Sequence, residues 1–88
     1  MISKEYKNTA AEGIHARPAT ALVKLSKKFT SSISMKKGER TVRLNSLLNI
    51  LSLATKGDDT ITIIIEGEDE VSAMVAIDIF FHEELKHL

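Results

Sequence analysis

The stretch TITIIIE, residues 60–66, is the strongest strand signal in the chain and decides the fold class. Its β-branched residues favour extended backbone, and they are numerous enough to predict a central position in a sheet. Weaker strand signals lie in residues 2–8, around residues 33–35 and in residues 41–44. A turn at residues 37–39 joins the last two, so this part of the chain predicts a hairpin.

Three other segments have the apolar spacing or composition of helices, and they cover residues 18–29, 47–53 and 70–86. The resulting order is β-α-β-β-α-β-α, which contains the split βαβ pattern. We therefore predict an α+β fold in which a four-stranded antiparallel sheet carries three helices on one face.

Length and composition limit what such a protein can do. With 88 residues we expect one domain, residues 1–88, which has no room for a separate catalytic domain. Twelve basic and twelve acidic residues cancel, and four aromatic residues are present, so a nucleic-acid partner is not expected. There is no cysteine, no apolar signal segment and no apolar run of bilayer length. We expect a cytoplasmic protein without membrane insertion.

The motif GIHARPAT, residues 13–20, predicts a phosphohistidine site. Gly13 permits a sharp turn and Pro18 fits the first turn of a helix, so the helix should begin at about residue 17 or 18. His15 would then lie just outside the first turn, where unpaired N–H groups and the helix dipole favour an anion. The dipole also disfavours a protonated ring, so we expect an imidazole that is largely neutral, and hence nucleophilic, at pH 7. The guanidinium of Arg17 could bind a phosphoryl group placed there.

The first predicted helix has an apolar side and a basic side. The apolar side comprises Pro18, Ala19, Leu22, Leu25, Ser26 and Phe29. The opposite side comprises Arg17, Thr20, Lys24, Lys27 and Lys28. This basic stripe could steer acidic partner proteins towards His15. An ordinary solvated helix face explains the same charges and stays open as the alternative.

Ser46 directly precedes the second predicted helix, in the preferred N-cap position. No Glu or Gln follows at the third helical position, so the capping box is incomplete. Ser46 could be a cap alone, or a hydroxyl that tolerates phosphorylation because it stands at a helix entrance. The helix contains more leucine and isoleucine than one buried face accommodates, so we expect an exposed apolar patch that serves for docking.

In these motifs the chain resembles the HPr family, the histidine-containing phosphocarriers of the bacterial phosphoenolpyruvate-dependent sugar phosphotransferase system. The resemblance extends over essentially the whole chain. The residues that carry it are GIHARPAT (13–20), NSLL (45–48) with SLA (52–54), Lys56-Gly57, and GEDE (67–70). It implies an open-faced β-sandwich, four antiparallel strands covered by three helices.

The resemblance also implies roles for individual residues. His15 would accept a phosphoryl group on Nδ1 from phosphorylated enzyme I and pass it to an enzyme IIA domain, with Arg17 and Ala16 contacting the phosphate. Ser46 would match a regulatory serine that a dedicated kinase phosphorylates, with a phosphorylase and a transcriptional regulator as further partners. The partner surface would comprise Thr20, Lys24, Lys27, Leu47, Leu48 and Leu51. The resemblance implies a carrier rather than an enzyme, and we expect no cofactor.

The last predicted helix has a core stripe of Met74, Ile77, Phe81 and Leu85, whereas Val75, Ile79 and Phe80 should point elsewhere. This excess apolar surface is either a site of self-association or tolerated exposure, and we expect a monomer. His82 and His87 lack the neighbouring ligands of a metal site, so no bound metal is expected.

Two other functions remain open. Asn49 and Ala54 stand where glycine is frequent in Gram-positive members, and Asn45-Ser46 is similar to the nitrogen-regulatory branch. A regulatory HPr-like protein that acts mainly through protein binding is therefore the principal alternative, although the presence of His15 favours a carrier. A small RNA-binding ferredoxin-like domain fits the element order but lacks basic charge and sheet aromatics.

Overall fold

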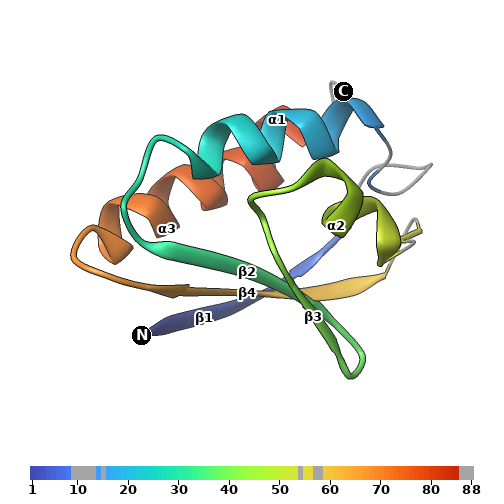
Figure 1. Ribbon diagram of the computed structural model, residues 1–88, viewed down its shortest axis with the longest axis horizontal. Helices are drawn as coiled ribbons and strands as arrows, with labels where there is room; N and C mark the ends of the chain where they lie inside the picture. The colour runs from blue at the N-terminus through green and yellow to red at the C-terminus, as the bar shows by residue number, and fades with distance from the viewer. Residues whose placement is uncertain (9–13, 15, 54, 57–58, 86–88) are drawn as a thin grey trace.

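The computed structural model describes residues 1–8, 14, 16–53, 55–56 and 59–85. Its elements, in chain order, are β1 (Ile2–Lys7), α1 (Ala16–Ser26), β2 (Ser32–Lys37), β3 (Arg40–Arg43), α2 (Leu47–Ser52), β4 (Thr60–Glu66), α3 (Glu70–Ile79) and a π-helical turn (Phe80–Glu84). Within these ranges, the four strands form one antiparallel sheet in the order β1-β4-β2-β3. The three α-helices lie on one face of that sheet (Figure 1). The predicted α+β fold is confirmed.

β4 lies in the middle of the sheet and organises the core. Its side chains alternate, so that Ile61, Ile63 and Ile65 are fully buried beneath the helices. Ile65 lies opposite Ile2 of β1 and Ile33 of β2, which extends the apolar layer across three strands. A slip of one residue would turn the buried isoleucines to the open face, so this alternation fixes the register.

The predicted hairpin joins β2 and β3. Lys37 lies opposite Arg40, which leaves Gly38 and Glu39 as a two-residue turn. Gly38 has a φ of 63°, in the left-handed region that costs glycine least. β3 begins and ends one residue before the predicted stretch.

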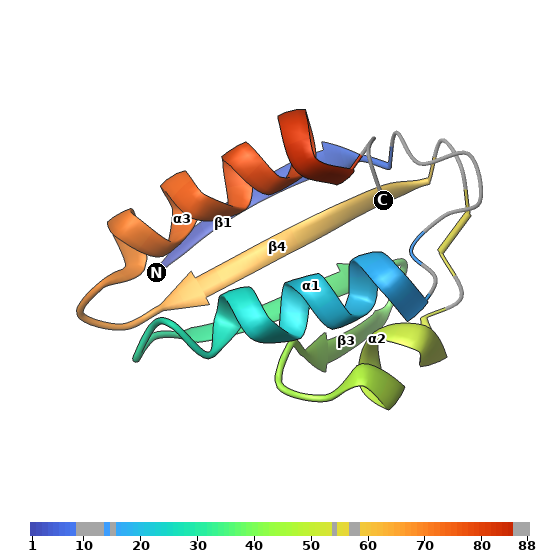
Figure 2. The same ribbon diagram turned by 90° about the horizontal axis from the view of Figure 1, so that it is seen from above.

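α1 and α3 cover the sheet on the two sides of β4 (Figure 2). Each helix buries one face: α1 contributes Pro18, Ala19 and Leu22, and α3 contributes Ala73, Met74 and Ile77. None of the helices in the described part of the chain has the length and apolar character that crossing a bilayer requires.

The end of the last helix differs from the sequence-based prediction. α3 stops at Ile79 and the chain continues in a π-helical turn, in which the N–H of Leu85 donates to the carbonyl of Phe80. The extra residue in this turn shifts the helical phase, so that Phe80 and Phe81 are both buried. The expectation that Phe80 points away from the core was therefore wrong, whereas Val75 and Ile79 are exposed as predicted.

The first strand is attached to the last helix through Tyr6. Its ring stacks on that of Phe81, with centroids 4.5 Å apart. Its hydroxyl donates to the carboxylate of Asp78, which also binds Lys4 Nζ at 2.8 Å. Burial, aided by Asp78, raises the pKa of Tyr6 above its usual range. The hydrogen bonds from Lys4 and Tyr6 lower the pKa of Asp78.

Asp69 fastens the loop between α1 and β2 to the start of α3. Its carboxylate accepts hydrogen bonds from the backbone N–H groups of Thr30 and Ser31, both at 2.9 Å, and from the Ser31 hydroxyl. These bonds, above all the one from the Ser31 hydroxyl, lower the pKa of Asp69. Gly67 approaches the same loop so closely that a Cβ there would lie 2.6 Å from Ser31 Cα.

Candidate functional site

The predicted phosphohistidine motif leads into α1. The helix begins at Ala16, one or two residues earlier than predicted. Arg17 is helical although it precedes Pro18. Pro18 itself lies in the first turn, where its missing N–H costs no helical hydrogen bond. Gly13 and His15 lie outside the described residues, so the nucleophilic role of His15 stays a prediction.

The basic stripe is exposed as predicted, although α1 ends at Ser26 rather than at residue 29, so Lys27 and Lys28 lie in the turn that follows the helix. All five residues of the basic side are exposed: Arg17, Thr20, Lys24, Lys27 and Lys28. Lys24 and Lys27 are the two that we expect to contact partner proteins through their charge. Ala16 is exposed as well, next to Arg17. The hydroxyl of Thr20 donates to the carbonyl of Ala16 at 2.7 Å, one turn earlier. The exposed basic stripe therefore starts in the first turn of the helix.

Ser46 is the N-cap of α2, as predicted. Its backbone is extended, and its Oγ accepts a hydrogen bond from the N–H of Asn49 at 3.4 Å. This bond satisfies one of the donors left unpaired at the start of a helix. The regulatory role of Ser46 stays a prediction.

α2 exposes part of its apolar surface, as its composition predicts. Leu48 is 77% exposed and Leu47 37%, whereas Leu51 is half-buried and Ile50 is fully buried. The exposed leucines lie on a helix that packs beside the first half of α1 (Figure 2). Exposed cations and exposed leucines thus lie on two neighbouring helices on the same face of the sheet.

The C-terminal end of α2 is held by the β2–β3 hairpin. Arg40 Nη1 donates to the carbonyl of Ser52 at 2.7 Å, and Nη2 donates to its hydroxyl at 3.2 Å. A guanidinium at a helix C-terminus both satisfies an unpaired carbonyl and complements the dipole. With Ser46 at one end and Arg40 at the other, this short helix is fixed at both termini.

The segment between α2 and β4 contains contacts that the sequence analysis missed. Thr55 Oγ1 accepts a hydrogen bond from the N–H of Ile14 at 3.0 Å, and both residues are buried. Asn8 Nδ2 donates to the carbonyl of Lys56 at 2.9 Å, and the N–H of Asn8 donates to the carbonyl of Asp59 at 2.8 Å. No local sequence signal marks these bonds, because the partners lie far apart in the chain.

Asp59 stabilises this segment. Its carboxylate accepts a hydrogen bond from the N–H of Lys56 at 2.7 Å and lies 3.0 Å from Lys37 Nζ. Hydrogen bonding to Lys37, followed by that to the Lys56 backbone, lowers the pKa of Asp59. The segment is thereby connected to the end of β2 as well as to β1.

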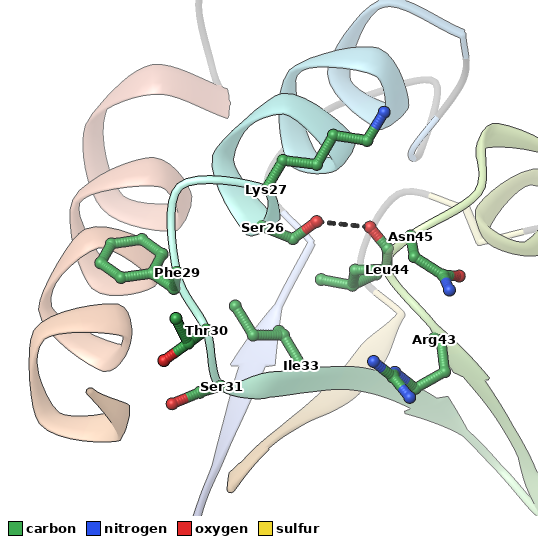
Figure 3. Close-up of a pocket in the computed structure, with 9 residues that line it drawn as sticks. All are labelled: Ser26, Lys27, Phe29, Thr30, Ser31, Ile33, Arg43, Leu44 and Asn45. Carbon is green, nitrogen blue, oxygen red and sulfur yellow. Dashed lines mark hydrogen bonds between the residues drawn. The ribbon is translucent and has the colours of Figure 1, made fainter. Parts of the chain in front are cut away.

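A cavity of about 150 Å³ opens between the end of α1, the loop that follows it and the end of β3 (Figure 3). The hydroxyl of Ser26 donates to the carbonyl of Leu44 at one wall, at 2.7 Å. This cavity lies at the C-terminal end of α1, away from the predicted phosphohistidine motif. Among the described residues, no three histidine or acidic side chains gather as a metal site requires.

Comparison with known proteins agrees with this arrangement. A family model described as the phosphorylation site of the PTS HPr component matches residues 2–83. The HPr-like protein Crh of Halalkalibacterium halodurans is 37% identical over 84 residues, which are 96% of this chain and all of that protein.

Solved structures share the fold. The histidine-containing phosphocarrier protein of a mycoplasma superposes with a TM-score of 0.91 at 32% identity and covers 97% of each chain. Crh of Bacillus subtilis, whose structure is described as a swapped dimer, has a TM-score of 0.75 at 29% identity, with 97% of this chain and 98% of that chain covered.

Proposed function

The chain belongs to the HPr family, and from this we propose that it carries a phosphoryl group on His15 between proteins of a phosphoenolpyruvate-dependent sugar phosphotransferase system. The observation that supports this proposal most is the start of α1 at Ala16 with Arg17 exposed in its first turn, directly after His15 in the chain. A helix that starts there presents unpaired N–H groups and a guanidinium for a phosphate.

In the proposed reaction, enzyme I donates the phosphoryl group from a phosphohistidine. The P–N bond to enzyme I breaks as a P–N bond to Nδ1 of His15 forms, and the same exchange then moves the group to an enzyme IIA domain. Arg17 and Ala16 would bind the transferred phosphate, and the partners would supply the remaining transition-state stabilisation across a transient interface. The protein is then a carrier rather than an enzyme, and it would act in the cytoplasm as a single domain, residues 1–88.

We place partner binding on a docking surface formed by Thr20, Lys24, Lys27, Leu47, Leu48 and Leu51. Its lysines are exposed and its leucines are exposed or half-buried, so it combines positive charge with apolar area. That combination fits acidic partners that also offer an apolar contact, as protein interfaces commonly do. Enzyme I and enzyme IIA domains would compete for this surface.

Ser46 is the proposed site of regulation. Its phosphorylation would put about two negative charges beside Leu47, at the edge of the docking surface. The modified protein would be repelled by an acidic enzyme I and would present a new surface to a transcriptional regulator. This proposal requires a Ser46 kinase, and a phosphorylase to reverse it.

A regulatory role without phosphoryl transfer is the second candidate, because Crh, a regulatory HPr-like protein, is among the relatives of this chain. His15 distinguishes the two functions, since a protein that acts through binding alone has no need of a nucleophile there. The docking surface and Ser46 serve either function.

Incubation with phosphoenolpyruvate and enzyme I tests the proposal directly. We expect one acid-labile phosphate per chain, located on His15 by mass spectrometry of peptides. His15→Ala should abolish it, whereas His82→Ala, which removes an exposed histidine of the π-helical turn, should leave it unchanged. Wild-type protein that remains unphosphorylated with an active enzyme I, or label that persists in His15→Ala, would exclude the carrier function.

A further inference from the structure

The N–H of Ile14 is bound by a side chain from a distant part of the chain. Ile14 is buried in the core, and its N–H donates to the hydroxyl of Thr55, at 3.0 Å. Thr55 is itself only 6% exposed, so water does not compete freely for either group. A buried backbone donor needs an acceptor, and here a side chain from a distant part of the chain provides it.

The segment between α2 and β4, which contains Thr55, also binds the chain at Asn8, before the motif GIHARPAT. Asn8, at the end of β1, is bound by its N–H to the Asp59 carbonyl and by its side chain to the Lys56 carbonyl. Asn8 and Ile14 are the described residues that flank positions 9–13. The residues on both sides of these positions are therefore attached to the segment that joins α2 to β4.

The hydrogen bond between Ile14 and Thr55 can influence His15 because Ile14 and His15 are covalently linked neighbours in the chain. Ile14 directly precedes His15, so the placement of the Ile14 peptide sets where the backbone of His15 starts. Phosphoryl transfer in line between two side chains is sensitive to displacements of about 1 Å, which can cost about a hundredfold in rate. We therefore expect a bond that fixes Ile14 to affect the rate of phosphoryl transfer at His15.

We propose that Thr55 is a positioning residue for His15, acting through the N–H of Ile14. This inference rests on the proposed function, since it concerns the same phosphoryl transfer. Thr55 contacts neither the phosphate nor a partner in this scheme. Because Thr55 lies three residues beyond α2, it also joins His15 to the helix that carries the leucines of the docking surface.

Thr55→Val tests the inference, because valine has nearly the shape of threonine and lacks the accepting oxygen. We expect kcat for phosphorylation by enzyme I to fall about tenfold, within the range that misplacement causes, while KM stays within about twofold because the docking surface is intact. Thr55→Ser keeps the acceptor and should restore at least half of the wild-type kcat. Thr41→Val, at an exposed position of β3, is the matched control and should behave as wild type.

Urea unfolding and NMR separate positioning from loss of fold. In folded Thr55→Val, the Ile14 amide signal should move and exchange faster with solvent, and the His15 backbone signals should shift, whereas Thr41→Val should change neither. Wild-type kcat in Thr55→Val, a rise in KM alone, or an equal loss of kcat in Thr55→Ser would overturn the inference and leave the carrier function standing. If wild type accepts no phosphoryl group, the carrier function fails, and unchanged His15 signals in Thr55→Val would then refute the positioning role separately.

Discussion

Arg17 is the described side chain on which the proposed phosphate site depends most. It is exposed in the first turn of α1, so its removal should not disturb the core. Its expected contribution is a charge-assisted hydrogen bond to the phosphoryl group, which is stronger than a neutral one.

We predict that Arg17→Ala changes the free energy of unfolding by less than about 0.5 kcal/mol, as is usual at exposed positions. Loss of a charged hydrogen bond worth about 1.5–3 kcal/mol should slow transfer from enzyme I roughly tenfold to a hundredfold. Rapid-quench kinetics with labelled phosphoenolpyruvate measures this rate. Lys28→Ala, which removes an exposed cation at the far end of the stripe, is the control, and equal rates in the two variants would remove Arg17 from the site.

Asp78 gives the fold a dependence on pH. Its hydrogen bonds with Lys4 and Tyr6 lower its pKa in the folded protein, so it releases its proton more readily there than in the unfolded chain. A lowered folded-state pKa stabilises the protein above the unfolded-state value, and that stability is lost as the pH falls through the folded value.

Asp78→Asn should therefore unfold at lower urea concentration than wild type at pH 7, and the difference should shrink as the pH falls below about 4, the ordinary range of an aspartate. Glu68→Gln, at an exposed acidic position, is the control and should unfold at the same urea concentration as wild type at pH 7. A difference between Asp78→Asn and wild type that stays constant from pH 7 to pH 3 would contradict this account.

At the level of elements, α2 combines a structural and a regulatory role at the same residue. Ser46 caps the helix through the N–H of Asn49, while its proposed phosphorylation acts on docking. The two roles can be separated because asparagine and aspartate both cap helices well, and aspartate alone adds charge.

We predict that Ser46→Ala loses about 0.5–2 kcal/mol of stability through the lost cap, whereas Ser46→Asn and Ser46→Asp remain near wild type. Ser46→Asp should be phosphorylated by enzyme I more slowly than Ser46→Asn, because its charge lies beside the docking surface. Thermal unfolding and steady-state kinetics on the three proteins give both readouts. Transfer to Ser46→Asp at the rate of Ser46→Asn would show that charge at this position does not regulate docking.

For the whole molecule, the exposed face of α3 raises the question of self-association. Val71, Val75 and Ile79 follow one another along this face and are 68%, 55% and 46% exposed. Stable interfaces commonly bury about 800 Å² on each partner, which three side chains do not provide.

We therefore expect a monomer, and sedimentation velocity over a hundredfold range of concentration measures this. Sedimentation should not change with concentration, and Val75→Lys should sediment as wild type does. A dimer that Val75→Lys dissociates would show that the α3 face is an interface. A dimer that persists in Val75→Lys would indicate another mode of dimerisation, such as the domain swapping described for Crh of Bacillus subtilis.

Most of the fold could be predicted because its signals are local. The alternation in β4, the turn at Gly38 and the cap at Ser46 each depend on a few neighbouring residues, and each is present in the structure. The exposed sides of α1 and α2 also followed from periodicity and composition.

The remaining features arise from contacts between distant residues. A regular helical period places Phe80 outside, whereas in the structure the π-helical turn buries it, with its ring edge-on to that of Phe81. The hydrogen bond from Ile14 to Thr55 joins residues that are 41 positions apart in the sequence, so no local pattern indicates it. His15 and Arg17 could be predicted from the motif alone. Thr55, which we propose positions His15, could be identified only from the hydrogen bond in the structure.

The attachment of β1 to the last helix through Tyr6, Lys4 and Asp78 has a consequence for biosynthesis. The ribosome makes β1 before β4 and before Phe81, so the strand that pairs with β1 and the ring that covers Tyr6 both arrive later. Until α3 has been made, β4, an apolar and β-branched strand of the kind that aggregates, lacks one of the helices that shield it. The isoleucines of β4 are therefore fully shielded from those of another copy only once α3 has packed on the sheet.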